Sequence, residues 1–179
     1  KEKSPAVVDE LIPDNLSVGG VQKVMQNLLK ERIPVRDTQT ILECLADYAP
    51  VTKEPDVLTE YVRGSLGRTI CQLFQNDEGS IPVLTVSPEL EQQIADSMQS
   101  TAGGIKVVMA PDILNQLSEQ LAERIDSMVS NGQTPIVLTS PNVRLAFRRV
   151  TETTFPSLTV LSYNEIVPGV DIYSVGTVA

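Results

Sequence analysis

The sequence predicts an α/β protein in two parts, a small helical bundle followed by an α/β subdomain with a mixed, partly parallel sheet. In residues 1–76, apolar residues recur at intervals of three and four, the period of an amphipathic helix. From residue 77 onward, short apolar runs alternate with helical stretches, which is typical of a sheet with parallel strands. The polar break QNDEGS at 75–80 lies where the pattern changes. We therefore expect subdomains of 1–76 and 77–179.

The helical part is expected to contain three main helices and a short one over 6–11. Ser17 is a candidate N-cap of the first main helix, and Asp37 is a candidate N-cap of the second. Pro55 suits the first turn of a third helix that continues to Phe74. The apolar face expected for the first helix consists of Val18, Val21, Met25, Leu28 and Leu29.

The α/β part is expected to alternate strands with helices. The expected strands cover 82–86, 105–109, 135–139, 158–161 and 171–178. The expected helices cover 88–100, 112–130 and 141–152.

The composition argues against nucleic acid and membrane lipid as partners. Aromatic residues make up 4% of the chain, and the net charge of −9 is spread over both halves, so phosphate groups would be repelled. No apolar run reaches the roughly 18 residues that a membrane helix needs, and the first residues do not resemble a signal peptide, so we expect a soluble chain. Because the chain starts at Lys1 rather than Met, we expect it to be a piece of a longer protein.

Several kinds of chemistry are disfavoured by the residue types present. The chain has no histidine, which removes the Ser-His-Asp triad, the Cys-His pair and zinc sites built on imidazole. Cys44 and Cys71 lie within helical patterns and are expected to be buried free thiols in a reducing compartment. The pairs at 19–20 and 103–104 are Gly-Gly without the spacing of a nucleotide-binding loop. We therefore expect no catalytic residue, no metal site and no cofactor.

Two similar corners, IPVLTVSPEL at 81–90 and TPIVLTSPNV at 134–143, end an apolar run with Ser-Pro. One interpretation makes Ser87 and Ser140 helix N-caps, with proline at the first helical position. The other is a serine nucleophile assisted by Lys106, although proline removes an N–H that an oxyanion hole would use. We favour the caps.

The helix expected at 141–152 places Arg144 and Arg148 one turn apart. They form either a solvated face paired with nearby acids or, together with Arg149, a binding site for an anionic partner of a generic adaptor. Glu89 and Glu91 lie on an exposed pattern and are expected to act as solubilising charge.

Two long segments carry a family resemblance: ELIPDNLSVGGVQKVMQNLLKERIPVRDTQTILECLADYAP and KEPDVLTEYVRGSLGRTICQLF. They closely resemble the cytoplasmic C-terminal region of the FlhA-type export gate of type III secretion, which flagella and injectisomes share. The α/β part resembles the family in TPIVLTSPNVR, LTVLSYNEI and VGTVA. The motifs LADYAP and LTEYVR resemble the flagellar branch more than the injectisome branch.

The resemblance implies the third, helical, and the fourth, α/β, subdomain of a region on the cytoplasmic side of the bacterial inner membrane. Such regions form nine-membered rings, receive export chaperones with their substrates, and work beside a separate export ATPase without being enzymes. The family's ring contacts imply, at matching motif positions, the subunit-interface candidates Arg36, Asp37, Glu60, Arg63 and Arg68. The alternative is intramolecular, with Asp37 as a helix cap and the others in surface pairs or salt bridges inside the bundle.

Overall fold

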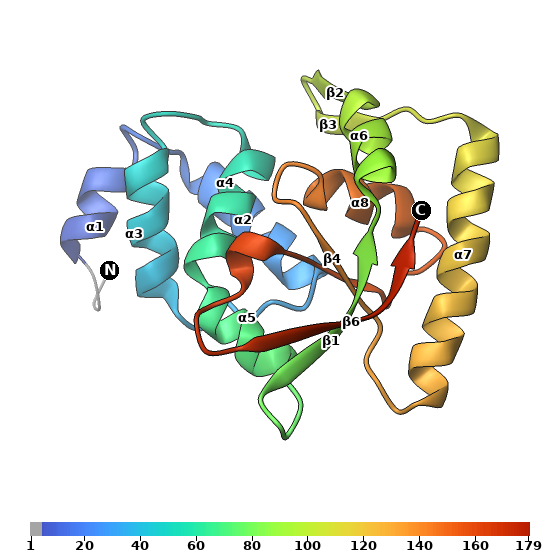
Figure 1. Cartoon of the computed structure of the whole chain (residues 1–179). Coiled ribbons are helices and arrows are strands. Elements are labelled where there is room, and N and C mark those ends of the chain that lie inside the picture. Colours follow the sequence, from blue (N-terminus) through green and yellow to red (C-terminus); the bar gives the residue numbers. More distant parts are fainter. Residues whose placement is uncertain (1–4) are drawn as a thin grey trace. The chain divides into compact units, whose positions relative to one another are not determined.

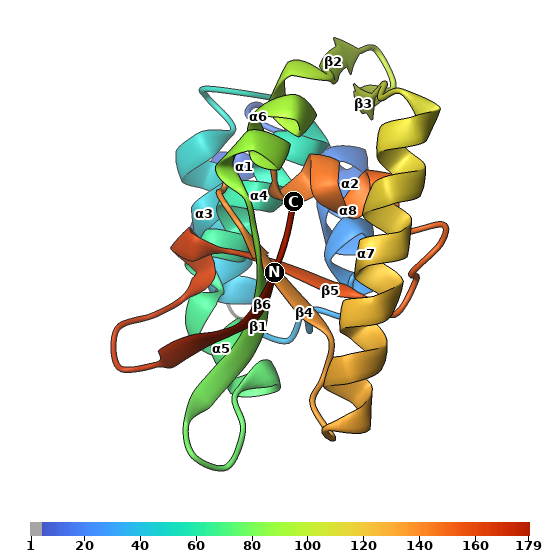
Figure 2. The same cartoon turned by 45° about the vertical axis from the view of Figure 1, so that its right-hand side comes forward.

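The computed structural model describes residues 5–179 (Figures 1 and 2). The chain divides into two compact units, residues 1–70, here called the helical unit, and residues 71–179, the α/β unit. This division falls within helix α5 (Gly67–Phe74). The expected subdomain boundary lies a few residues later, at the polar break that follows this helix.

The helical unit contains α1 (Pro5–Leu11), α2 (Val18–Lys30), α3 (Thr38–Tyr48) and α4 (Pro55–Ser65). Helix α4 packs against both α2 and α3, and α1 packs against α3. The single third helix expected from Pro55 to Phe74 is wrong, because Leu66 leaves helical geometry (φ −89°, ψ 13°) between α4 and α5.

The buried face of α2 differs from the expected one. Val24 and Leu28 are fully buried, four residues apart and so on the same side of the helix. Val18 and Leu29, which were expected on the apolar face, are 65% and 55% exposed. The apolar stripe of α2 is wider than the surface that packs against α4. Periodicity alone does not show which part of this stripe is buried, and this explains the error.

The α/β unit is built on a four-stranded parallel sheet in the order β5-β4-β1-β6. Its strands are β1 (Ser80–Val86), β4 (Ile136–Thr139), β5 (Thr159–Ser162) and β6 (Asp171–Val178). The predicted α/β class is confirmed. The two central strands read as nearly continuous apolar runs because both of their faces are covered.

Three helices accompany the sheet: α6 (Pro88–Asp96), α7 (Pro111–Ser130) and α8 (Arg144–Thr151). Their apolar faces share a core with the strands that includes Leu84, Ile94, Leu121, Val137, Phe147 and Val160. A single turn of 3-10 helix, η1 (Tyr163–Glu165), follows β5.

A small antiparallel hairpin replaces the end of the helix expected at 88–100. Its strands are β2 (Met98–Thr101) and β3 (Gly104–Val107), and they form a sheet of their own. Gly104 adopts φ 101°, a conformation that glycine reaches easily, and Thr101 Oγ1 donates a hydrogen bond of 2.7 Å to its carbonyl. This local turn allows 98–107 to pair with itself instead of extending α6.

Both cysteines are buried and free, as predicted. Burial raises the pKa of the Cys44 thiol, and the charge of Asp47 raises it further, against a hydrogen bond with Ser65 that lowers it. Among residues 5–179, no helix is both long and apolar enough to cross a membrane.

Candidate functional site

The carboxyl edge of the parallel sheet is the first place to look for a ligand site, because α/β proteins bind ligands there. Three neighbouring strands carry a serine at this edge: Ser87 follows β1, Ser140 follows β4, and Ser162 ends β5. The three serines have different hydrogen-bond partners.

Ser87 is an N-cap, as predicted. Its Oγ accepts a hydrogen bond of 3.2 Å from the backbone N–H of Leu90, and Pro88 occupies the first helical position of α6. In the helical unit, Ser17 caps α2 in the same way, accepting from the N–H of Gly20 at 3.1 Å.

Ser140 is not a helix cap, so that prediction is wrong. Its Oγ donates to Glu91 Oε2 at 2.5 Å and its backbone N–H donates to Glu91 Oε1 at 2.7 Å, while α8 begins only at Arg144. Parallel pairing of Leu84 with Val137 brings the ends of β1 and β4 together, and Glu91 lies one turn into α6. Glu91 is half-buried, so its interpretation as exposed solubilising charge is also wrong.

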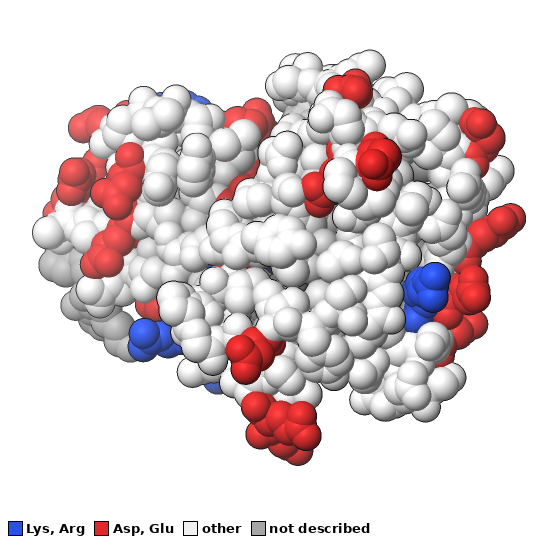
Figure 3. Space-filling view, viewed as in Figure 1, with Lys and Arg blue, Asp and Glu red and all other residues white. Residues whose placement is uncertain are grey.

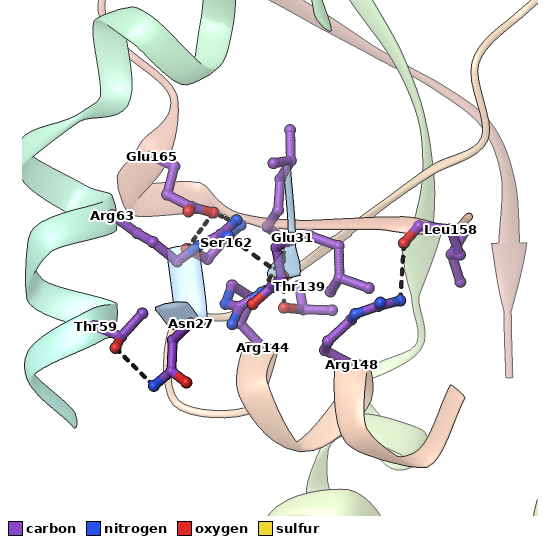
Figure 4. A network of polar contacts seen from close by, with 12 residues as sticks. Asn27, Glu31, Thr59, Arg63, Thr139, Arg144, Arg148, Leu158, Ser162 and Glu165 are labelled. Carbon is purple, nitrogen blue, oxygen red and sulfur yellow. Dashed lines mark hydrogen bonds and ion pairs between the residues drawn. The ribbon is translucent and has the colours of Figure 1, made fainter. Parts of the chain in front are cut away.

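Ser162 and Glu165 form a capping box that sequence reasoning missed. Glu165 Oε2 accepts from the N–H of Ser162 at 2.6 Å and from its Oγ at 3.1 Å, and Glu165 is 1% exposed (Figure 4). The order Ser-x-x-Glu after a strand was a usable signal. Backbone N–H groups at this edge thus bind the protein's own carboxylates, in the manner in which other α/β proteins bind phosphate.

Arg144 and Arg148 are buried, contrary to both predicted surface roles. Arg144 is 0% exposed and donates from Nη1 to the carbonyl of Val160 at 3.2 Å. Arg148 is 9% exposed and donates from Nη1 to the carbonyl of Leu158 at 3.2 Å (Figure 4). The two arginines hold the segment around β5 against α8. Neither is available as a partner contact in this fold, because burial, which spacing does not reveal, removes both from the surface.

In the helical unit, Arg63 forms an internal ion pair. Its Nη1 lies 3.3 Å from Glu31 Oε2, and the two side chains are 1% and 14% exposed. One turn earlier, Asn27 donates to Thr59 Oγ1 at 3.1 Å (Figure 4). Both pairs join α2 to α4, and they lie one helical turn apart along the interface between these two helices.

The remaining candidates of the helical unit lie at or near the surface. Arg36 and Arg68 are exposed, and Glu60 is half-buried. Asp37 is exposed and caps α3, accepting from the N–H of Thr40 at 3.2 Å. Acidic side chains dominate the face of the molecule shown in Figure 3, in keeping with the net charge of −9. The predicted subunit contacts of Arg36, Asp37, Glu60 and Arg68 remain predictions.

A stacked pair of tyrosine rings joins α3 to α4. The rings of Tyr48 and Tyr61 stack with centroids 3.9 Å apart and an angle of 9°, and Tyr61 is 39% exposed. Helix α4 therefore carries motif residues that hold both of its neighbours.

The described residues offer little for metal chemistry. Across residues 5–179, no group of three or more His, Cys, Asp or Glu side chains is placed to hold a metal ion. What the geometry provides is two units stabilised by internal polar contacts, with charged and apolar residues left on their surfaces.

Comparison with known proteins identifies the family. A sequence profile of the FHIPEP family matches residues 1–171. The chain belongs to the FHIPEP family. The flagellar biosynthesis protein FlhA of Bacillus subtilis is 39% identical over 178 residues, which are 99% of this chain and 26% of that protein. The chain thus spans about a quarter of the length of this relative.

Solved structures agree with this assignment. The Chlamydia pneumoniae CdsV protein superposes with a TM-score of 0.88 at 31% identity, covering 99% of this chain and 51% of that one. A structure of the CdsV and CdsO protein complex matches with a TM-score of 0.84, covering 99% and 52%. The nonameric EscV cytosolic domain from the type III secretion system matches with a TM-score of 0.80 at 26% identity, covering 99% and 52%.

Proposed function

We propose that this chain is the helical and α/β part of the cytoplasmic region of a flagellar protein export gate, on the cytoplasmic side of the bacterial inner membrane. The observation that carries the proposal is the collinear match of 99% of the chain to a flagellar FlhA at 39% identity. The role is one of assembly and docking rather than catalysis. The carboxyl edge of the sheet supports this view, because Glu91 and Glu165 already bind its serines.

The proposed assembly is a nine-membered ring of identical subunits, in which the helical unit supplies contacts. The nonameric form of the related EscV domain supports the stoichiometry. Arg36, Asp37 and Arg68 are exposed, and Glu60 is half-exposed, so charged pairs could form across a subunit boundary. Arg63 is excluded from this role because it is buried against Glu31.

The proposed partners are export chaperones with their substrates and components of the export ATPase complex. The structure of CdsV with CdsO supports binding of a further protein by a member with this fold. An injectisome export gate is the second candidate, favoured by the TM-score of 0.80 with the EscV cytosolic domain from the type III secretion system. The higher identity to the flagellar relative makes the flagellar assignment the preferred one.

Titration calorimetry with purified chaperone–substrate complexes tests this proposal. The full cytoplasmic region that contains this chain should bind flagellar complexes and bind injectisome complexes at least about tenfold more weakly. The reverse preference would support the injectisome alternative. Absence of binding to either set, by a region that is folded by circular dichroism, would contradict the docking role.

A further inference from the structure

The α/β unit contains a groove beside the β2–β3 hairpin that none of the contacts above uses. Its volume is about 350 Å³, and β3, α7 and α8 contribute its walls. Figure 2 shows the hairpin at the top of the view, with the chain running from β3 into the start of α7. Aliphatic side chains provide most of the lining: Ile105, Val107, Val108, Leu114 and Val150.

These aliphatic side chains remain partly open to solvent. Val108 is 62% exposed, and Ile105, Val107, Leu114 and Val150 are each only half-buried. An apolar groove of this size has room for about two aliphatic side chains of a partner.

One backbone edge of β3 points away from β2, toward α8, and only part of it is already hydrogen-bonded there. Val108 donates its N–H to the carbonyl of Ser97. In this antiparallel pair, the backbone N–H and C=O groups of the even-numbered residues of β3 therefore point toward β2. The N–H and C=O groups of Ile105 and Val107 therefore point away from β2. The guanidinium of Arg149 on α8 donates to the carbonyl of Ile105, which agrees with that direction.

The charge of this groove differs from the charge of the whole chain. Lys106, which is exposed, and Arg149 line it together with one acid, Glu152. A second groove of the α/β unit, of about 490 Å³ at the amino ends of the strands, is lined by Asp77 and Glu78 and by no Lys or Arg. In a protein of net charge −9, a cationic apolar groove favours an acidic segment over a basic one.

We propose that the groove beside β3 binds an extended, acidic and aliphatic peptide segment of a partner protein, which adds a third strand to the hairpin. Successive side chains of an extended strand point to opposite faces. A segment that alternates aliphatic and acidic residues would place aliphatic groups beside Ile105 and Val107 and carboxylates beside Lys106. Main-chain hydrogen bonds to Val107 would set its register.

The proposal does not rest on ring assembly. A chain that fails to form rings could still bind the segment, and failure of peptide binding would leave the ring and chaperone experiments unaffected.

The test uses the 179-residue chain and a labelled nine-residue peptide of alternating leucine and aspartate. Fluorescence anisotropy should show saturable binding, and nuclear magnetic resonance should place shift changes at Ile105, Val107 and Val150. Exchange of the Val107 amide should slow in the complex. Peptides of alternating serine and aspartate, or leucine and lysine, should bind at least about tenfold more weakly.

Two matched variants locate the site. Lys106→Glu should weaken binding about tenfold, whereas Arg124→Glu, at an exposed arginine of α7 outside the groove, should change it by less than about twofold. Val108→Ser should weaken binding without changing the thermal midpoint, because the side chain is 62% exposed.

Any one of four results would overturn the proposal. These are no saturable binding up to about 1 mM peptide, equal losses in the Lys106 and Arg124 variants, or shift changes confined to the groove that contains Asp77 and Tyr173. Self-association of the chain, with dissociation when the peptide is added, would assign the groove to a second copy and would also overturn the proposal.

Discussion

The arginines of this protein occupy two environments that serve different purposes. Arg144 and Arg148 are buried in the α/β unit and donate to backbone carbonyls, and Arg63 is buried in the helical unit against Glu31. Arg36 and Arg68 are exposed on the helical unit. A buried guanidinium must have its donors satisfied, so its loss disturbs the fold, whereas an exposed one contributes little to stability and remains available to a partner.

The largest effect on stability is expected from Arg148→Ala. The substitution removes the donors to the carbonyls of Phe155, Pro156 and Leu158 and leaves a cavity, at an expected cost of about 3 kcal/mol. Urea unfolding followed by circular dichroism measures this cost, with Arg124→Ala as the exposed control expected within about 0.5 kcal/mol. Equal losses in the two variants would remove the distinction between buried and exposed arginines.

Glu91→Ala is expected to cost about 2 kcal/mol, because both the N–H and the hydroxyl of Ser140 lose their acceptor. Glu89→Ala, two residues earlier on the exposed side of the same helix, is the matched control and should cost less than about 0.5 kcal/mol. Thermal unfolding of the pair measures the difference. A smaller loss for Glu91 than for Glu89 would contradict the role assigned to this carboxylate.

The two Ser-Pro corners should respond differently to aspartate. Ser87→Asp keeps an acceptor at a helix N-terminus and should change stability by less than about 0.5 kcal/mol. Ser140→Asp places a carboxylate beside Glu91 and removes a donor, so it should cost about 2 kcal/mol. Similar unfolding midpoints for the two variants would show that the corners are equivalent after all.

Cys44 gives a smaller, pH-dependent effect. Because the folded state raises the pKa of this thiol, folding favours the neutral thiol. The stabilisation that the neutral thiol contributes to the folded state is therefore fully present at neutral pH. Stability should then fall as the pH rises past the ordinary thiol range, and Cys44→Ser should reduce that dependence. Denaturation midpoints between pH 7 and pH 10 measure it, and a slope unchanged by the substitution would be the opposing result.

Local patterns predicted the elements better than the contacts between them. The cap at Ser87 could be predicted because it depends on three adjacent residues, Ser-Pro-Glu, whose preferences agree. The role of Ser140 could not, because its partner Glu91 is 49 residues away and meets it only through strand pairing. Burial of Arg144 and Arg148 depends likewise on the segment around β5, since the spacing of two arginines is the same on a buried and an exposed helix face.

The exposed arginines should have the smallest effect on stability and the largest on assembly. The double substitution Arg36→Glu and Arg68→Glu should leave the free energy of unfolding of the chain within about 0.5 kcal/mol of that of the unmodified protein. Circular dichroism checks this, and a loss comparable to that of Arg148→Ala would show that these side chains support the fold.

Mass photometry of the full cytoplasmic region tests whether exposed charges of the helical unit form subunit contacts while the buried arginines stabilise the fold. The comparison is made at a concentration where the unmodified protein forms rings. We expect the variant with Arg36→Glu and Arg68→Glu to lose the ring species and keep a folded monomer, and the Arg124→Glu variant to keep the rings. Rings of unchanged abundance in the double variant would contradict it.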